Sequence, residues 1–281
     1  MNLRESSLPA GWYPRNPDEI SRFLSGIAQD VVQDAAQGSA HAAIAPHAGW
    51  RYSGKIAARA AAAMRGDIET IVVIGGHLSA GYPPLFALED AVSTPLGAMT
   101  INAALRDALF RELGGREDRF PDNTVEVLLP MARFFFPDAS LLWIRLPAEL
   151  RSFDAGKAIA AAAKNSGCAA AVLASTDLTH YGSNYGFTPK GTGPEALRWM
   201  REVNDRHFID AVESGDAAAV LERAETDSSS CSAGAVLGAM GFASASGLDT
   251  ARLLEYGTSA DVVGVEAGSF VGYAALAFWE K

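Results

Sequence analysis

Three histidines of this chain each follow a short apolar segment that is typical of a buried strand. The apolar segments are 42–45, 70–74 and 169–174, and the histidines are His47, His77 and His180. An imidazole can bind a metal or exchange a proton near neutral pH. In an open α/β sheet, ligands bind at the carboxyl ends of the strands. A single histidine after a strand is usually structural, but three on separate strands predict a shared site at that edge.

The elements around these histidines predict how they are positioned. Residues 42–77 have the pattern strand, helix, strand, and a right-handed crossover would make the two strands parallel, with His47 and His77 at one edge. Strand 141–146, helix 153–165 and strand 169–174 repeat the pattern. We therefore expect an α/β fold in which a largely parallel central sheet is flanked by helices.

The remaining segments are expected to complete one domain over residues 1–281. An irregular arm is predicted at 1–16, followed by a helix capped by Asn16 and, after His47, a helix capped by Ser53 that begins near Lys55. Single helices are predicted over 123–135 and 194–213, and a further helix over 232–243. Strands at 252–256 and 269–278 are expected to complete the sheet. Caps of this kind satisfy free backbone N–H groups at helix starts.

Composition limits the classes of function. The chain has 281 residues, of which 49% are hydrophobic and 20% charged, with a net charge of -10. This negative charge argues against nucleic acid as a partner. Apolar runs are too short for a transmembrane helix, and the N-terminus lacks the apolar core of a signal peptide. Two cysteines are too few for a disulfide framework, which favours a cytoplasmic protein. A homo-oligomer is left open.

Cys231 and Asp177 are the other candidates for a metal site. Cys231 follows three serines and precedes a predicted helix, where a thiol ionises easily and can bind a metal. A small buried residue at a tightly packed helix explains it equally well. Asp177 lies three residues before His180, so it can orient a ligand or exchange protons. The alternative for Asp177 is an ordinary turn residue.

Three further residues are weaker candidates for contacts with a substrate. Trp50 and Tyr52 follow His47 and can form the wall of a pocket, although aromatic side chains more often pack in a core. Glu126 lies among apolar residues, so its carboxylate needs a partner or must face solvent. The chain lacks the P-loop, dinucleotide, zinc-protease helix and serine-hydrolase elbow motifs, which argues against those classes.

Three segments resemble the MEMO family, which is also called AmmeMemoRadiSam system protein B. APHAGWRYSG at 45–54 is similar to the family's Pro-His-Ala-Gly-aromatic-x-Tyr-Ser-Gly signature. STDLTHYG at 175–182 resembles its Ser-Ser/Thr-Asp-x-Ser/Thr-His-Tyr-Gly motif, and DNTVEVLLP at 122–130 resembles its His-Ser-x-Glu-Val-Gln-Leu-Pro segment. The resemblance covers nearly the whole chain. It implies the fold of the class III extradiol ring-cleavage dioxygenases.

The resemblance also implies roles for individual residues. His47, His77 and Cys231 would be metal ligands, with Asp177 and His180 beside them. In the related dioxygenases, two histidines and a glutamate hold iron(II). Cys231 would then replace the glutamate, and His180 would be the acid–base group.

This chain departs from the family's pattern at four places. The second strand ends in Gly75-Gly76-His77, one residue tighter than Gly-Pro-x-His. Asn123, Leu128 and Ser232 replace the usual histidine, glutamine and glycine.

Three functions follow from these observations. The first is a metalloenzyme that carries out iron- or copper-dependent redox or oxygen chemistry, because two histidines and one anionic ligand leave coordination positions open. The second is a non-catalytic module that binds a peptide in the same cleft. The third is a zinc hydrolase with a Cys-His-His site. We expect iron(II) as the metal, with copper or zinc as alternatives, and a small molecule or peptide as the ligand.

Overall fold

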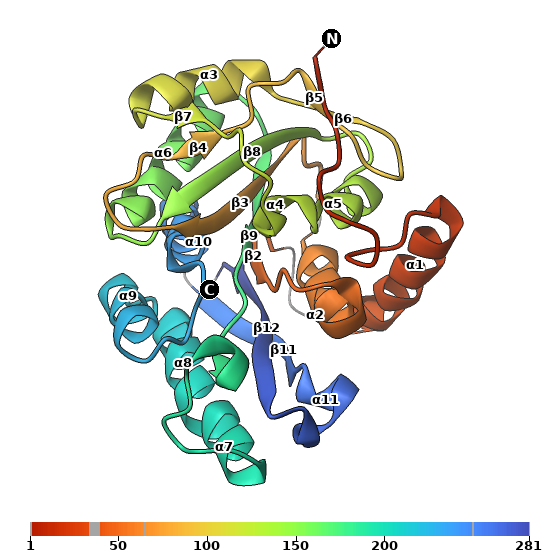
Figure 1. Cartoon of the computed structure of the whole chain (residues 1–281). Helices are drawn as coiled ribbons and strands as arrows, with labels where there is room; N and C mark the ends of the chain where they lie inside the picture. The colour runs from red at the N-terminus through yellow and green to blue at the C-terminus, as the bar shows by residue number, and fades with distance from the viewer. Residues whose placement is uncertain (1, 34–39, 65, 249, 281) are drawn as a thin grey trace.

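The computed structural model describes residues 2–33, 40–64, 66–248 and 250–280 (Figure 1). Four parallel strands form the centre of its main sheet, in the order β2 (Ala42–Ala45), β9 (Ala170–Ser175), β3 (Thr70–Leu78) and β8 (Ser140–Pro147). Nearly all their residues are buried, as expected when helices cover both faces of a parallel sheet. The predicted α/β fold with a parallel centre is therefore confirmed.

The flanks of this sheet are mixed rather than parallel. β12 (Ser269–Trp279) runs antiparallel to β2, and it also pairs antiparallel with β11 (Thr250–Thr258) and β10 (His180–Gly182). On the other side, β4 (Leu85–Phe86) is antiparallel to β8 and parallel to β7 (Arg116–Glu117). A separate small sheet contains β1 (Leu3–Arg4), β5 (Ala91–Val92) and β6 (Met99–Thr100). The arm at 1–16 thus contributes a strand and is not wholly irregular.

Two apolar cores lie on opposite faces of the sheet. One contains side chains of α1 (Pro17–Gln33), α2 (Trp50–Ala63) and α5 (Leu129–Phe135). The other contains side chains of α3 (Ala103–Glu112), α6 (Arg151–Ser166), α8 (Asp205–Ser214), α9 (Ala217–Thr226) and α10 (Ala233–Ala245). The remaining helices are α4 (Asn123–Glu126), α7 (Pro194–Trp199) and α11 (Ala260–Val263), with short 3-10 turns at Ser183–Tyr185 and Val265–Ala267.

Helix α10 packs closely on α6, and glycines of both helices explain why. A Cβ atom at Gly156 of α6 would collide with the carbonyl of Gly238, and one at Gly241 would collide with the carbonyl of Phe153. These absent side chains let α6 and α10 approach backbone to backbone. This packing fixes the start of α10, where Cys231 lies, against the carboxyl end of the sheet.

Several local predictions needed correction. Asn16 caps α1 as predicted, because its Oδ1 accepts the N–H of Asp18 at 2.8 Å. The helix after His47 begins at Trp50 rather than near Lys55, and Ser53 is not its cap: its Oγ donates to the Ala48 carbonyl at 3.1 Å.

Two segments that were predicted as single helices are interrupted in the structure. Segment 123–135 forms α4 and α5, because Pro130 starts a new helix instead of continuing the old one. Segment 194–213 contains a π-helical turn, Met200–Asn204, between α7 and α8. Within the described residues, no helix combines the length and hydropathy that a bilayer crossing requires.

Candidate functional site

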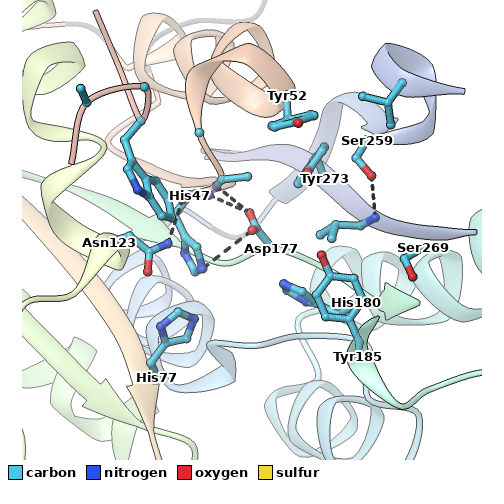
Figure 2. Close-up of a pocket in the computed structure, with 17 residues that line it drawn as sticks. His47, Tyr52, His77, Asn123, Asp177, His180, Tyr185, Ser259, Ser269 and Tyr273 are labelled. Carbon is cyan, nitrogen blue, oxygen red and sulfur yellow. Dashed lines mark hydrogen bonds and ion pairs between the residues drawn. The ribbon is translucent and has the colours of Figure 1, made fainter. Parts of the chain in front are cut away.

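A cleft of about 710 Å³ lies at the carboxyl ends of the central strands (Figure 2). His47, His77, Asp177 and His180 all line this cleft. His47 follows β2, His77 lies near the end of β3, and His180 begins β10, which pairs with β12. The structure therefore brings the three predicted histidines into one cavity.

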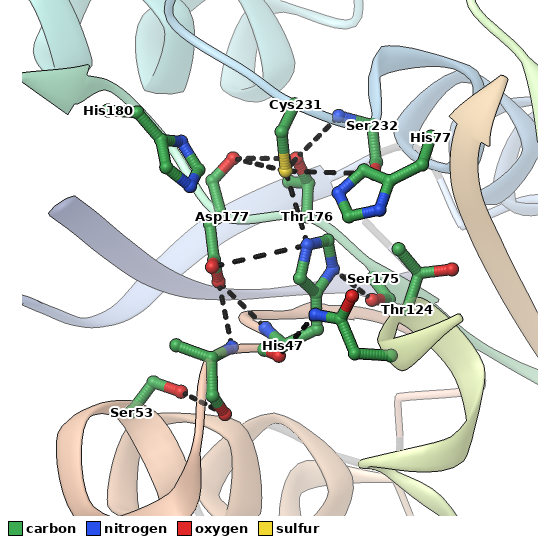
Figure 3. A network of polar contacts seen from close by, with 12 residues as sticks. His47, Ser53, His77, Thr124, Ser175, Thr176, Asp177, His180, Cys231 and Ser232 are labelled. Carbon is green, nitrogen blue, oxygen red and sulfur yellow. Dashed lines mark hydrogen bonds and ion pairs between the residues drawn. The ribbon is translucent and has the colours of Figure 1, made fainter. Parts of the chain in front are cut away.

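Two of these histidines, His47 and His77, form a cluster with Cys231 that can hold a metal ion. One donor atom each from His47, His77 and Cys231 lies within 4.8 Å of the other two. The Nε2 atom of His47 is 3.2 Å from Sγ of Cys231, and the two imidazole rings are 4.9 Å apart and nearly perpendicular. The donors come from three elements far apart in sequence, the loop after β2, β3 and the start of α10 (Figure 3).

His47 is fully buried and is held from three sides. Its Nδ1 atom lies 2.5 Å from Oγ of Ser175, which is the residue opposite Ala45 in the pairing of β2 with β9. Its backbone N–H donates to Oδ1 of Asp177 at 2.8 Å, and its carbonyl accepts from Nδ2 of Asn123 at 3.0 Å. With Nδ1 bonded to the hydroxyl, Nε2 is the atom that is available to a metal.

His77 differs from its predicted position after a strand. It lies inside β3 at an irregularity between Gly75 and Leu78, with a φ of 57° in the left-handed region. A Cβ atom on Gly76 would collide with the side chain of Ser232. Gly76 therefore lets β3 pass close to the start of α10, and this approach places His77 beside Cys231.

A buried ionic network lies behind His77. Oδ2 of Asp122 is 3.2 Å from Nδ1 of His77 and 3.1 Å from the guanidinium of Arg145. Arg145 also contacts Asp118 at 3.3 Å and donates to the Gly76 carbonyl at 3.0 Å. Because Nδ1 is engaged by the carboxylate, Nε2 of His77 is left for the cluster.

The charges in this network shift two pKa values strongly. Burial opposes ionisation of Asp122, but the hydrogen bonds from His77 and Thr124 and the Arg145 charge lower its pKa to about 2. Burial also opposes protonation of His77, but Asp122 and Cys231 raise its pKa to about 10. In the absence of a metal, His77 is therefore a cation between two anions.

Cys231 is favoured as a thiolate. Burial raises the pKa of a thiol, but the charge and hydrogen bonds of His47 and His77 outweigh burial and lower the pKa of Cys231 well below its ordinary value. Its backbone N–H donates to the Asp177 carbonyl at 3.3 Å. Cys168 is elsewhere, with its Sγ 3.1 Å from Oγ1 of Thr70. Of the two sequence interpretations of Cys231, this environment favours the ligand.

Asp177 and His180 adjoin the cluster without belonging to it. Oδ1 of Asp177 accepts the N–H groups of His47 and Ala48 at 2.8 and 3.2 Å, so the carboxylate shapes the loop that carries His47. Burial raises the pKa of Asp177. Nδ1 of His180 lies 3.1 Å from the carbonyl of Leu178, which can only accept, so this nitrogen carries the proton. Nε2 of His180 is then the ring nitrogen that is left for the cleft.

Of the three predicted substrate contacts, Tyr52 alone lines the cleft. Trp50 lies in the core, where its Nε1–H donates to the Val127 carbonyl at 3.0 Å. Glu126 is also buried away from the cleft and holds the N-terminal arm: its carboxylate accepts the N–H groups of Ser7 and Leu8 and the hydroxyl of Tyr13. Burial opposes ionisation of Glu126, but the Ser7 and Ser6 hydrogen bonds lower its pKa.

Sequence reasoning missed several residues of the site. They are the supports Asp122 and Ser175, and the aromatic lining residues Trp12, Tyr185 and Tyr273. Asp122 could have been recognised from the sequence only as a helix cap, because aspartate is favoured at that position. In the structure its Oδ1 accepts the Thr124 N–H at 2.8 Å. The aromatic residues lie far apart in sequence and follow no spacing rule.

Comparisons with known proteins place the chain in a family. The family model described as Memo-like protein matches residues 4–277. Among similar proteins, MEMO1 family protein PAE0818 of Pyrobaculum aerophilum is 30% identical, with 99% of this chain and 100% of that protein covered. MEMO1 family protein MTH_45 of Methanothermobacter thermautotrophicus is 29% identical, with 98% and 99% covered.

A solved structure was also matched, that of the uncharacterized protein JW3007 from Escherichia coli K12. Its TM-score is 0.44 at 14% sequence identity, with 83% of this chain and 98% of that chain covered. The family assignment rests on the sequence comparisons, because the family model spans nearly the full length and the relatives align from end to end. The chain therefore belongs to the Memo family.

Proposed function

We propose that this protein binds a divalent metal, with iron(II) as the preferred ion, and carries out redox or oxygen chemistry on a small organic molecule. The observation that carries this proposal is the cluster of His47, His77 and Cys231, whose donor atoms lie within 4.8 Å of one another and two of which line the cleft. Two imidazoles and one thiolate suit iron, copper and zinc.

The donor set fits a metal for reasons beyond proximity. Ser175 and Asp122 bond the Nδ1 atoms of the two histidines, which is how proteins orient imidazole ligands. Cys231 has the low pKa that a thiolate ligand requires. Three protein ligands leave coordination positions open, and bound iron(II) would supply redox chemistry with oxygen or an oxygen-bearing substrate there.

His180 and Asp177 have separate roles in this proposal. His180 has its Nδ1 proton on the Leu178 carbonyl, so its Nε2 is the group that accepts a proton from a substrate in the cleft. Asp177 positions His47 through two backbone N–H groups. Oδ2 of Asp177 lies 4.0 Å from Nε2 of His47, beside the space that the substrate occupies.

The cleft volume supports a small molecule rather than a peptide as the ligand. About 710 Å³ is within the range of sites that enclose small ligands. Tyr52, Tyr185 and Tyr273 line the region beyond the histidines (Figure 2), so the substrate lies between the metal ligands and an aromatic wall.

The test is metal content after anaerobic purification of the wild type, Cys231→Ala and Cys168→Ala. Cys168 is the matched control, because it is the second cysteine and lies outside the cluster. We expect near-stoichiometric iron or copper in the wild type and in Cys168→Ala, and its loss in Cys231→Ala.

Other results of this test lead to different functions. If the wild type contains zinc alone, the result would favour a hydrolase with a Cys-His-His site over redox chemistry. Equally low metal in all three proteins, even after loading with each ion, would contradict the proposal. The cleft would then be a binding site for a peptide or another organic ligand.

A further inference from the structure

The cleft has two chemically different ends. We call His47, His77 and Cys231 the metal end, and Trp12, Tyr52, Tyr185 and Tyr273 the aromatic end. The aromatic residues come from the N-terminal arm, α2, the turn after β10 and β12, respectively. Tyr52 and Tyr185 are 38% and 47% exposed, whereas Tyr273 is buried at 2%. Figure 2 shows the three tyrosines around the space in front of Asp177 and His180.

Apart from its three histidines, the described lining of the cleft carries little charge. Among the described residues that line the cleft there is neither a lysine nor an arginine, and Asp177 is the one carboxylate. Its residue exposure is 4%, and Oδ1 already accepts two backbone N–H groups. Oδ2 is oriented toward His47, at 4.0 Å. Histidines are thus the one kind of basic side chain that the described lining offers to an anionic substrate, and the aromatic end has none of them.

The tyrosines of the aromatic end favour a cationic ligand. Burial, together with the Asp177 charge, raises the pKa of Tyr185 and of Tyr273, so both phenols stay neutral. The π faces of neutral tyrosines attract cations, and groups of aromatic side chains bind quaternary ammonium ions in this way. The net charge of -10 attracts cations to the protein as a whole.

We propose that the substrate of this cleft carries an ammonium group, which binds among Tyr52, Tyr185 and Tyr273 beside the Asp177 carboxylate. The inference rests on the proposed function, because it takes the space next to the metal ligands as the substrate site. It adds a chemical class to that function: the molecule presents a cation to the aromatic end while its reacting part faces the metal end.

The test compares three probes of the same shape on metal-free protein by isothermal titration calorimetry. The probes are choline, its uncharged isostere in which carbon replaces the quaternary nitrogen, and a carboxylate with the same branched alkyl group. A cation–π contact with an acid nearby predicts that choline binds at least about fivefold more tightly than the neutral isostere. The carboxylate should bind most weakly. Equal affinities, a preference for the anion, or no binding of choline would overturn the proposal.

Two variants of Tyr185 locate the effect. Tyr185→Leu should lose most of the preference for choline over the isostere, whereas Tyr185→Phe should keep it, because phenylalanine retains the π face. Tyr82→Leu is the matched control, since Tyr82 has a similar exposure of 43% and lines a different cavity. An unchanged preference in Tyr185→Leu would contradict the assignment to this wall.

Metal content, measured on the same samples, separates this proposal from the proposed function. Tyr185→Leu should retain the wild-type metal content. If the wild type binds choline selectively but never binds a metal, the proposed function fails and the ammonium site stands. If the wild type binds a metal but does not prefer choline, the ammonium site fails and the proposed function stands.

Discussion

Two aspartates, the half-buried Asp122 and the buried Asp205, lie behind the two ends of the cleft and have pKa values shifted in opposite directions. Asp122 contacts two cations, His77 and Arg145, and its pKa falls to about 2. Asp205 lies behind the aromatic end and receives neutral donors, namely the N–H and hydroxyl of Thr179 and the hydroxyl of Tyr256. Burial therefore raises the pKa of Asp205 to about 6.

This difference shows how the two ends are built. The metal end depends on charge, because an ionic network of Asp118, Asp122 and Arg145 holds His77 beside the cluster. The aromatic end depends on neutral hydrogen bonds and packing, and its one lining carboxylate, Asp177, has no basic partner from the described lining residues except histidine. Mutations at the two ends should consequently affect different properties of the protein.

The largest expected effect is at the metal end. His47→Ala removes a ligand whose Nε2 is 3.2 Å from Cys231, and we expect metal binding to be lost. Elemental analysis and competition with a chromogenic chelator measure this loss. His207→Ala is the control, because His207 is exposed on α8. Iron bound as tightly by His47→Ala as by the wild type would exclude His47 as a ligand.

The aromatic end should respond to pH through Asp205. The folded state holds the Asp205 proton more tightly than the unfolded chain does, with pKa values of about 6 and 3.8, respectively. The Asp205 proton therefore stabilises the folded state fully below pH 3.8, and this stabilisation is lost as pH rises through about 6. The loss is complete at neutral pH and amounts to about 3 kcal/mol.

Asp205→Asn tests this pH dependence, because an amide keeps the shape of the side chain without its ionisation. The variant should lose less stability than the wild type between about pH 4 and pH 7 in urea denaturation. Asp210→Asn is the control, since Asp210 lies on the same helix in an exposed ion pair with Arg206. Parallel profiles for the wild type and Asp205→Asn would show that Asp205 is not the group responsible.

A smaller effect is expected from Asp122→Asn, which leaves all three ligands in place. The substitution removes the charge that holds Nδ1 of His77, and loss of such a support costs about 10- to 100-fold in metal affinity. Chelator competition provides the affinity, and Asp107→Asn, at an exposed ion pair with Arg106, is the control. Unchanged affinity would mean that the β3 backbone alone positions His77.

The convergence of His47, His77 and Cys231 could be expected from the sequence because strand–turn topology and short motifs place each of them. His47 and Cys231 lie where local patterns placed a turn after a strand and the start of a helix. His77 was expected after β3 but lies within it, because Gly76 lets the strand continue past Ser232. A close approach between a strand and a distant helix cannot be read from either segment alone.

The aromatic end could not be predicted for a related reason. Tyr185 and Tyr273 meet only because β10 pairs antiparallel with β12, and that pairing joins segments about 90 residues apart. Trp50 shows the converse, because it lies next to His47 in sequence and yet packs into the core. The carboxylate of Glu126 accepts hydrogen bonds from the N-terminal arm, more than 100 residues away in the sequence, so its partners could not be predicted from its neighbours either.

The most direct test of the central claim is X-ray absorption spectroscopy of the metal in the loaded wild-type protein, with Cys231→Ala alongside. The account predicts one sulfur and two imidazole nitrogens around the metal, and loss of the sulfur in the variant. A metal surrounded only by oxygen and nitrogen in the wild type would contradict the cluster of His47, His77 and Cys231 as the metal site.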